Sequence, residues 1–443
     1  MKLEVKDKNY CASVVRINTL IELEGAKTIQ HAIIFGNSVI VGKNTKVNDI
    51  GLFFPIETKL SKDFLSNNNL YKDKTLNKDT TKSGFFEISG RVKCCKMING
   101  KFKSSGFFIT LDSLNYLGDF TFNIGDDFNI IDGKIVCEKY IIQGKENTGQ
   151  SDSGKKKNKK SVKVNRVVEN QYRLMNDTGM LAKEIDNINP DDIISISSKY
   201  HGTSWAVGNV LFKKIIPKWK QKITSWLGIG DELNYGIIYS SRKVVKNSFI
   251  NANPSHFYGM DLWGEIAESI KHLIPKGITL YGECVGFLPS GRAIQEAKGV
   301  AFDYGCAPKT YKLLVYRITS TNYDGKVIEF SWSQITDFCK TYGFEMPNTF
   351  YYGKAKDYFP QIPVSQHWHE NFLGLLTSTF MLDADCPYCN NKVPEEGIVL
   401  SVDNLFERRS YKLKNFRFRM KAETEEADKG NTNIEDEQSV IDI

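Results

Sequence analysis

The sequence predicts an α+β protein in which a small β-barrel precedes a larger domain of antiparallel sheets with flanking helices. In residues 1–140, short apolar runs recur, and Gly, Asn and Asp separate them, as is typical of short strands joined by turns. From about residue 166, strand-like runs alternate with segments of helical periodicity. A polar, lysine-rich stretch lies between the two regions. The 443 residues are enough for about two or three domains.

The N-terminal region, residues 1–143, is predicted to form the barrel. A segment over 64–71 is expected to be a short helix or an irregular excursion. Many short strands joined by tight turns favour a small barrel of the oligonucleotide-binding (OB) type. The expected strands cover residues 12–17, 32–35, 38–41, 50–54, 85–92, 106–111, 127–131 and 134–137.

One hairpin of this region is basic and aromatic, with a predicted turn at residues 98–101. Cations can follow a nucleic-acid backbone while aromatic rings stack on bases, so the hairpin is a candidate RNA-binding surface. The alternative is that the rings belong to the core and the cations are solvated. The basic residues are Arg91, Lys93, Lys96, Lys101 and Lys103, and the rings are Phe102, Phe107 and Phe108.

Two segments are too polar to bury enough apolar surface for ordered structure. Residues 144–165 are predicted to be a basic flexible linker, and residues 422–443 an acidic disordered tail. The net charge of +7 therefore understates how basic the folded body is. A basic body favours a polyanionic partner such as nucleic acid, although a generic lysine-rich surface is the alternative.

Several classes of protein are disfavoured. No run of about 18 apolar residues is present, so we expect no membrane-spanning segment. The N-terminus lacks the apolar core of a secretory signal. The nine cysteines have no framework spacing and suit a reducing compartment. We therefore expect a cytoplasmic protein.

The second domain is predicted to occupy residues 166–421. Helices are expected at 259–273 and 332–342, where apolar residues recur with helical spacing. Strands are expected at 193–198, 236–240, 279–282, 313–318, 397–402 and 411–413.

A lysine follows the first of these strands, in the stretch Ser-Lys-Tyr-His-Gly-Thr-Ser that begins at Ser198. A lysine at a strand end is held rigidly and can serve as a nucleophile once its amine is neutral. We expect Gly202, Thr203 and Ser204 to form a turn whose N–H and hydroxyl groups could bind phosphate oxygens. Lys199 is the candidate nucleophile, with His201 beside it as a catalytic or loop-fixing residue.

Further polar residues stand on the later strands, and each has a use if the ligand is a nucleotide. Arg242 could clamp a phosphate or ribose oxygen, and Glu283 could accept from ribose hydroxyls. Tyr316 could stack on a purine. Glu396 could hold a divalent cation. Lys412 and Lys414 alternate along one strand, so both point to the same side and could converge on one phosphate.

The order and spelling of these stretches resemble the covalent nucleotidyltransferase superfamily of polynucleotide ligases and capping enzymes. Six stretches between residues 199 and 414 match its motifs in order. They are Lys199-Tyr200-His201-Gly202 for motif I, Ser241-Arg242 for Ia, Tyr281-Gly282-Glu283 for III, Tyr316-Arg317 for IIIa, Glu396-Gly397 for IV and Lys412-Leu413-Lys414 for V.

Differences from the usual motifs, together with the domain order, point to one group within the superfamily. His201 replaces the Asp usual in DNA ligases, and Lys-x-His-Gly-Thr is a spelling found among RNA ligases. Arg317 stands where many relatives have an acid, so no catalytic role is assigned to it. The candidate OB module precedes the catalytic domain, as in RNA ligases of the RNA ligase 5 type.

The resemblance implies an ATP-dependent RNA ligase that joins 3′-OH and 5′-phosphate ends. Lys199 would form a covalent lysyl–AMP intermediate with ATP, in the presence of Mg²⁺ or Mn²⁺, and AMP would then pass to the 5′-phosphate. The expected partners are RNA ends or a nicked duplex containing RNA, and the expected state is a monomer. The alternatives are a DNA ligase, an mRNA capping guanylyltransferase and an inactive OB-type RNA-binding protein.

A Cys-x-x-Cys pair remains outside these motifs. Cys386 and Cys389 have zinc-like spacing, and His367 and His369 could complete a site. No second cysteine pair lies near them, so a plain loop is the default interpretation.

Overall fold

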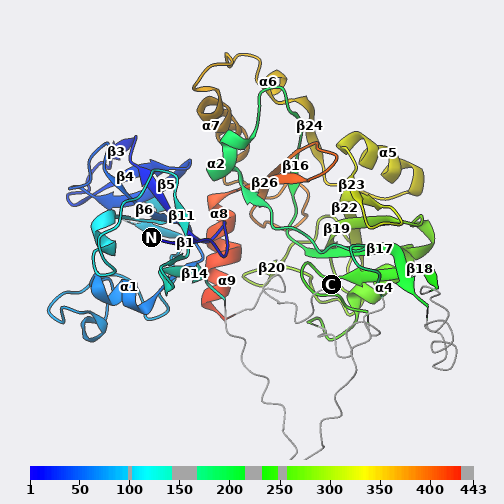
Figure 1. Cartoon of the computed structure of the whole chain (residues 1–443), viewed down its shortest axis with the longest axis horizontal. Helices are drawn as coiled ribbons and strands as arrows, with labels where there is room; N and C mark the ends of the chain where they lie inside the picture. Colours follow the sequence, from blue (N-terminus) through cyan, green and yellow to red (C-terminus); the bar gives the residue numbers. More distant parts are fainter. Residues whose placement is uncertain (98–101, 142–166, 215–231, 248–256, 431–443) are drawn as a thin grey trace, which may run out of the picture.

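The computed structural model describes residues 1–97, 102–141, 167–214, 232–247 and 257–430. The N-terminal β domain lies at one end of the molecule and the larger mixed domain at the other (Figure 1). The C-terminal helices, drawn in red, lie between the two. The expected linker over 144–165 falls outside the described residues.

The N-terminal domain consists of several short antiparallel sheets. The central sheet has the strand order β10-β6-β2-β11, and a second has the order β3-β4-β5. The strands are β1 (Leu3–Glu4), β2 (Ala12–Arg16), β3 (Leu20–Glu22), β4 (Ile29–Ile34), β5 (Asn37–Gly42), β6 (Ile50–Phe54), β7 (Thr58–Leu60), β8 (Cys95–Met97), β9 (Phe102–Ser104), β10 (Phe107–Thr110), β11 (Asp127–Phe128), β12 (Ile130–Ile131), β13 (Lys134–Ile135) and β14 (Cys137–Lys139).

Most of the expected strands of this domain are present, and helix α1 (Lys62–Asn67) begins the excursion expected at 64–71. Strands β8 and β9 pair antiparallel, as a hairpin requires, while the turn between them lies outside the described residues. A closed barrel is not confirmed, because the strands divide among separate small sheets. The strand expected at 85–92 is wrong: this segment makes only isolated bridges, at Phe86 and Arg91.

The larger domain contains two antiparallel-rich sheets of five strands each. The first has the order β15-β26-β25-β16-β24, and the second has the order β18-β17-β19-β22-β23. The strands are β15 (Gly179–Met180), β16 (Ile193–Lys199), β17 (Thr203–Lys213), β18 (Leu233–Ser240), β19 (Ile278–Gly286), β20 (Glu296–Ala297), β21 (Val300–Ala301), β22 (Tyr311–Thr321), β23 (Val327–Glu329), β24 (Thr349–Lys354), β25 (Gly397–Val402) and β26 (Arg409–Lys414).

Helices cover these sheets and close their cores. Helix α5 (Trp332–Tyr342) has the bounds that the sequence predicts, because Ser331 and Gln334 form a capping box and Gly343 ends the helix at φ 76°. The expected helix at 259–273 is α4 (Leu262–Ile270), which buries Trp263 against β17 and its neighbours. The remaining helices are α2 (Leu181–Glu184), α6 (Ala355–Tyr358) and α7 (Trp368–Phe380).

The C-terminal segment corrects the prediction of a disordered tail beginning at residue 422. Helix α8 (Phe416–Phe418), a π-helix (Arg419–Thr424) and α9 (Glu425–Asp428) continue the chain to Gly430. The acidic residues here are paired rather than solvated, since Glu423 bonds to Lys414 and Glu426 to Lys429. Residues 431–443 lie outside the described part of the chain.

No helix in the described residues is long and apolar enough to cross a membrane.

Candidate active site

Three neighbouring strands bring the stretch that contains Lys199, the candidate nucleophile, and the two C-terminal motifs into one row. In the register of the first sheet, Lys199 on β16 lies opposite Gly397 on β25, and Gly397 lies opposite Lys414 on β26. Residues more than 200 positions apart in sequence therefore meet at one end of the sheet. Both Lys412 and Lys414 line the cavity beside Lys199, as their alternation predicts.

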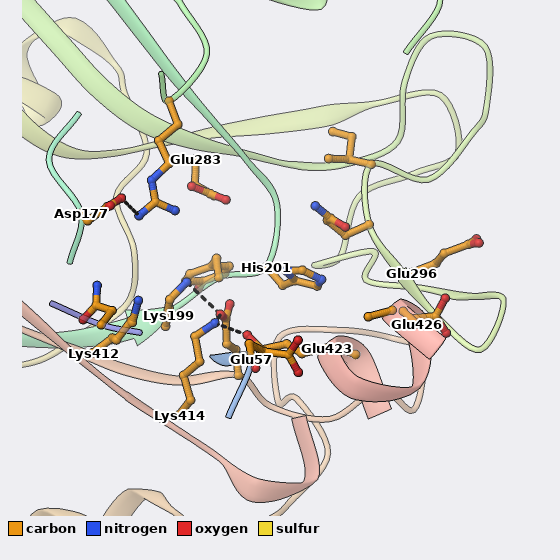
Figure 2. A pocket seen from close by; sticks show the side chains of 18 of the residues that line it. Glu57, Asp177, Lys199, His201, Glu283, Glu296, Lys412, Lys414, Glu423 and Glu426 are labelled. Atoms are coloured by element: carbon orange, nitrogen blue, oxygen red, sulfur yellow. Dashed lines mark hydrogen bonds and ion pairs between the residues drawn. The ribbon is translucent and has the colours of Figure 1, made fainter. Parts of the chain in front are cut away.

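A buried carboxylate bridges the two lysines of this row. Glu396 Oε1 lies 2.8 Å from Lys199 Nζ and 2.9 Å from Lys414 Nζ. Lys414 also pairs with Glu423 on the C-terminal helix at 2.5 Å. Figure 2 shows Lys199 and Lys414 pointing toward one another in this cavity. We call Lys199, Glu396 and Lys414 the catalytic cluster.

The second carboxylate oxygen of Glu396 is unsatisfied. Oε2 is buried and has no hydrogen-bond partner among the described residues. Burial raises the pKa of this carboxyl, but the charges of Lys199 and Lys414 outweigh burial and lower the pKa to about 2. A buried, ionised oxygen without a donor fits a hard divalent cation such as Mg²⁺ or Mn²⁺.

Two glycines of the motifs are required by close backbone approach. A Cβ at Gly202 would lie 2.2 Å from the carbonyl oxygen of Cys284. A Cβ at Gly397 would lie 2.1 Å from the carbonyl oxygen of Leu413, and Gly397 also has φ +136°. A side chain at Gly397 would push apart β25 and β26, and a side chain at Gly202 would push the loop after Lys199 away from β19.

Glu283 fixes the loop that follows the nucleophile. Its carboxylate accepts from the backbone N–H of Gly202 at 3.1 Å and from the Ser204 hydroxyl at 3.2 Å. The expected turn over residues 202–204 is wrong, because β17 already begins at Thr203. Two of the donors expected to face phosphate thus bind a carboxylate, while Glu283 itself lines the cavity.

Arg242 and Tyr316 reach the same space from the second sheet. Arg242 follows β18 and donates to Asp177 Oδ1 at 2.7 Å. The Tyr316 hydroxyl donates to Met175 Sδ at 3.3 Å, and burial raises the pKa of Tyr316. Asp177 and Met175 precede the second domain's first strand, and no sequence motif marks them.

Aromatic side chains contact the ring of His201. Its ring meets Phe302 and Phe418 edge-on, with centroids 4.9 Å and 5.0 Å away. Its backbone N–H donates to the Tyr304 hydroxyl at 2.7 Å. His201 lines the cavity, and its positive form would help lower the pKa of Glu396. The contacts favour positioning of the nucleophile loop.

The cavity beside Lys199 has a volume of about 430 Å³, and the N-terminal domain closes one side of it. Asn9, Tyr10 and Glu57 contribute to this wall. A smaller cavity of about 140 Å³ continues past Lys199 toward Tyr316. Residues of the N-terminal wall carry no recognisable motif, so sequence patterns alone could not place them here.

The basic hairpin residues of the N-terminal domain have different surroundings from those expected. Arg91 is buried and pairs with Glu57 at 2.6 Å and with Asp428 at 3.0 Å, so it joins the domains instead of facing solvent. Phe102 and Phe108 are buried in the core, as the alternative interpretation expected.

The remaining cations of the hairpin are more exposed than Arg91. Lys93 pairs with Asp428 at 2.8 Å, and Lys103 pairs with Asp383. Lys96 is exposed, and Lys101 lies outside the described residues.

A zinc centre is not supported at Cys386 and Cys389. The described residues contain no group of three or more His, Cys, Asp or Glu side chains arranged to hold a metal ion. His369 Nε2 instead lies 2.8 Å from the carbonyl oxygen of Ile188.

Comparison with known proteins identifies solved structures with the same fold. No family model matches the sequence, and no curated protein matches it. Solved structures do match over nearly the whole chain. The chain has the fold of an RNA ligase. One such structure is a Naegleria gruberi RNA ligase mutant with ATP and Mn, at a TM-score of 0.54 and 14% identity, covering 92% of this chain and 98% of that one.

Two further structures of the Naegleria gruberi RNA ligase give the same result. A mutant with AMP and Mn matches at a TM-score of 0.53 and 15% identity, covering 92% of this chain and 97% of that one. The ligase with PPi matches at 0.51 and 14%, covering 91% and 96%.

Proposed function

We propose that this protein is an ATP-dependent RNA ligase that joins 3′-OH and 5′-phosphate ends through a lysyl–AMP intermediate. The observation that carries the proposal is Lys199 at a strand end, 2.8 Å from a buried carboxylate whose other oxygen lacks a donor. The matched structures, RNA ligases with ATP, AMP or PPi, support the same chemistry.

Lys199 is the nucleophile. Its neutral amine attacks the α-phosphate of ATP, a P–N bond forms, and pyrophosphate leaves. Glu396 aims the amine, but its charge also favours the ammonium form, so the proton must leave before attack. AMP then passes from Lys199 to the 5′-phosphate, and a 3′-OH displaces AMP to form the phosphodiester bond.

Charge on the phosphoryl oxygens is stabilised by cations already in place. Lys412 and Lys414 line the cavity beside Lys199, and Arg242 approaches from the opposite sheet. Glu283 keeps the loop after Lys199 fixed, and Tyr316 offers a ring for the purine in the smaller cavity.

A divalent cation, Mg²⁺ or Mn²⁺, would be held by Glu396 Oε2. When bound, it would polarise the α-phosphate and offset the carboxylate charge that favours the lysine ammonium. The feature that fits a divalent cation is the buried Oε2 atom of Glu396, which has no hydrogen-bond partner among the described residues.

The N-terminal domain acts in this proposal as an OB-type module that positions RNA ends beside Lys199. Its residues Asn9, Tyr10 and Lys139 form part of the wall of the larger cavity. The exposed Lys96 is the hairpin cation best placed for a phosphate backbone. Intact Lys199, Glu396 and Lys414 argue against an inactive binding protein.

The test is incubation of the full-length protein with labelled ATP or GTP and Mg²⁺. We expect covalent AMP on wild-type protein and none on Lys199→Ala. Labelling from GTP instead would indicate a capping guanylyltransferase, and no labelling from either nucleotide would contradict the proposal. Nicked duplexes with RNA or DNA at the 3′-OH side then separate an RNA ligase from a DNA ligase.

A further inference from the structure

Cys386 and Cys389 form a close pair directly behind the nucleophile loop. Cys386 is buried and Cys389 is half-buried. The Cys389 backbone N–H donates to the Cys386 carbonyl oxygen at 3.4 Å, so the two residues close one tight turn. Neither belongs to the catalytic cluster. Two cysteines with two residues between them can close into an intramolecular disulfide.

A hydrogen bond from the Cys389 side chain lowers the pKa of the Cys386 thiol, although burial opposes this effect. The described residues provide no third ligand that would explain the pair as a metal site. The pair therefore has the chemistry of a dithiol.

Tyr388, between the two cysteines, links this turn to both neighbours of Lys199. Its hydroxyl accepts from the Ser198 hydroxyl at 3.1 Å. Its ring stacks on Tyr200 with centroids 5.5 Å apart. Ser198 and Tyr200 flank the nucleophile, so a shift of Tyr388 acts on both sides of Lys199.

Tyr304 provides a second link. Its backbone N–H donates to Cys389 Sγ at 3.4 Å, and its hydroxyl accepts from the His201 N–H at 2.7 Å. Tyr304 has φ 46°, a left-handed conformation that bulky residues rarely adopt. Its surroundings, including Cys389, must hold it there. The dithiol thus supports the loop that carries Lys199 by two independent routes.

We infer that Cys386 and Cys389 are a redox switch on Lys199, oxidised to a disulfide by hydrogen peroxide. The inference rests on the proposed function. The Cys386 thiolate attacks peroxide, the O–O bond breaks, and hydroxide leaves and becomes water, which gives a sulfenic acid. Cys389 sulfur then displaces hydroxide from the sulfenic sulfur. The S–S bond forms, the Cys389 proton leaves in a second water, and peroxide has accepted two electrons.

Closing the disulfide changes the support of the loop. The two sulfurs must approach to about 2.05 Å, which moves the turn and takes Cys389 Sγ away from the Tyr304 N–H. Tyr388 and Tyr304 shift with it, and the amine of Lys199 is displaced from its attacking position. The reduced protein is the active form.

The experiment compares reduced full-length protein with protein treated with hydrogen peroxide and then catalase. Oxidation should lower the rate of AMP transfer to Lys199 by at least about tenfold, since ångström-scale misplacement of a reacting group costs up to about a hundredfold. Dithiothreitol should restore the rate. Mass spectrometry should find the peptide with both cysteines lighter by two hydrogens.

Cys389→Ser keeps an acceptor for the Tyr304 N–H, so it should keep the reduced rate, and it should lose the response to peroxide because no disulfide can form. Cys95→Ser, which removes an exposed thiol elsewhere, is the matched control and should keep the response. Equal inactivation of Cys389→Ser and wild type would overturn the switch, as would a disulfide that leaves the rate unchanged. Stoichiometric zinc that is lost in Cys389→Ser would also overturn it.

A reduced protein that takes no label would contradict the proposed function instead. The switch is then decided by the reactivity of Lys199 toward an amine-acylating reagent, mapped by mass spectrometry. A change of reactivity on oxidation that is absent from Cys389→Ser supports the switch, and an unchanged reactivity overturns it.

Discussion

Two clusters of charged side chains in this molecule contain similar residues but differ in how fully their carboxylates are hydrogen-bonded. In the catalytic cluster, Glu396 bridges Lys199 and Lys414, and its second oxygen has no partner within the part of the chain that the structure describes. In the domain interface, both oxygens of Glu57 receive Arg91, at 2.6 Å and 2.8 Å. Glu57 also lines the larger cavity, but both of its carboxylate oxygens accept from Arg91, whereas Glu396 Oε2 has no donor among the described residues.

Arg91 extends this contrast through a second partner. Its guanidinium also reaches Asp428 at 3.0 Å, and Lys93 reaches the same carboxylate oxygen at 2.8 Å. The Arg91 side chain is 1% exposed and that of Lys93 is 36% exposed. Asp428 therefore pairs with one buried and one exposed cation. Variants of these two cations can show whether burial or charge sets the strength of the contact.

The largest expected effect is at Glu396. Glu396→Gln keeps the shape of the side chain but removes the charge that aims Lys199 and would hold the metal. AMP transfer from ATP should fall by about 10²–10³-fold, the usual loss for one preorganised electrostatic group. Glu57→Gln is the comparison variant: Glu57 lies in the N-terminal wall of the same cavity, but both of its oxygens are bound to Arg91, so the rate should change far less. Equal losses in both variants would erase the distinction between the clusters.

The next effect is on stability at the interface. Arg91→Ala removes the cation from Glu57, whose side chain is only 16% exposed, so the free energy of unfolding should fall by about 3–5 kcal/mol. Urea unfolding followed by fluorescence measures this change. A loss below about 1 kcal/mol would mean that the two domains do not depend on this contact.

The pH dependence of stability should have opposite signs in the two clusters. The pKa of Glu396 is lowered to about 2 from an ordinary value of 4.5. Its contribution, up to about 3 kcal/mol, is therefore present above pH 4.5 and lost as the pH falls toward 2. Burial raises the pKa of Glu57 despite Arg91, so folding favours its protonated form and Glu57 costs stability as the pH rises.

Thermal unfolding in EDTA between about pH 2 and 7 tests this. The stability of Glu396→Gln should vary less than wild type at low pH. Glu57→Gln should be relatively more stable than wild type at neutral pH than at low pH. The same slope change in both variants would contradict the assigned signs.

The smallest effect is expected from the exposed cation. Lys93→Ala removes a solvent-screened pair with Asp428, so unfolding free energy should change by less than about 1 kcal/mol. The same urea experiment measures it beside Arg91→Ala. A loss as large as that of Arg91→Ala would show that charge, not burial, holds the interface.

The candidate catalytic residues could be named from the sequence because each belongs to a short motif that is recognisable without its distant neighbours. Lys199, Glu396 and Lys414 stand at strand ends beside apolar alternation, and the structure brings them into one row. The predicted helix Trp332–Tyr342 is equally local, since its cap and its terminating glycine are neighbours in sequence.

The predictions that were wrong concern residues whose partners are far away in the sequence. Residues 422–430 look disordered because they are acidic, but Lys414, Lys298 and Arg91 pair with them after folding. Arg91 looks like a nucleic-acid contact because its partner carboxylates are 34 and 337 positions away. Distant partners leave no local pattern.

The sequence by itself determined the candidate nucleophile, its candidate carboxylate partner and the lysines beside them, because strand alternation and motif order are properties of the chain. Only the tertiary structure decided which charged side chains have all their hydrogen-bond partners and which do not. Glu396 Oε2 lacks a donor among the described residues, and Glu283 accepts from the loop after Lys199. In the Cys386–Cys389 turn, Tyr388 stacks on Tyr200, and Cys389 Sγ accepts from the Tyr304 N–H. Hydrogen-bond satisfaction depends on three-dimensional neighbours, and these are fixed only when the sheets and the C-terminal helix have packed.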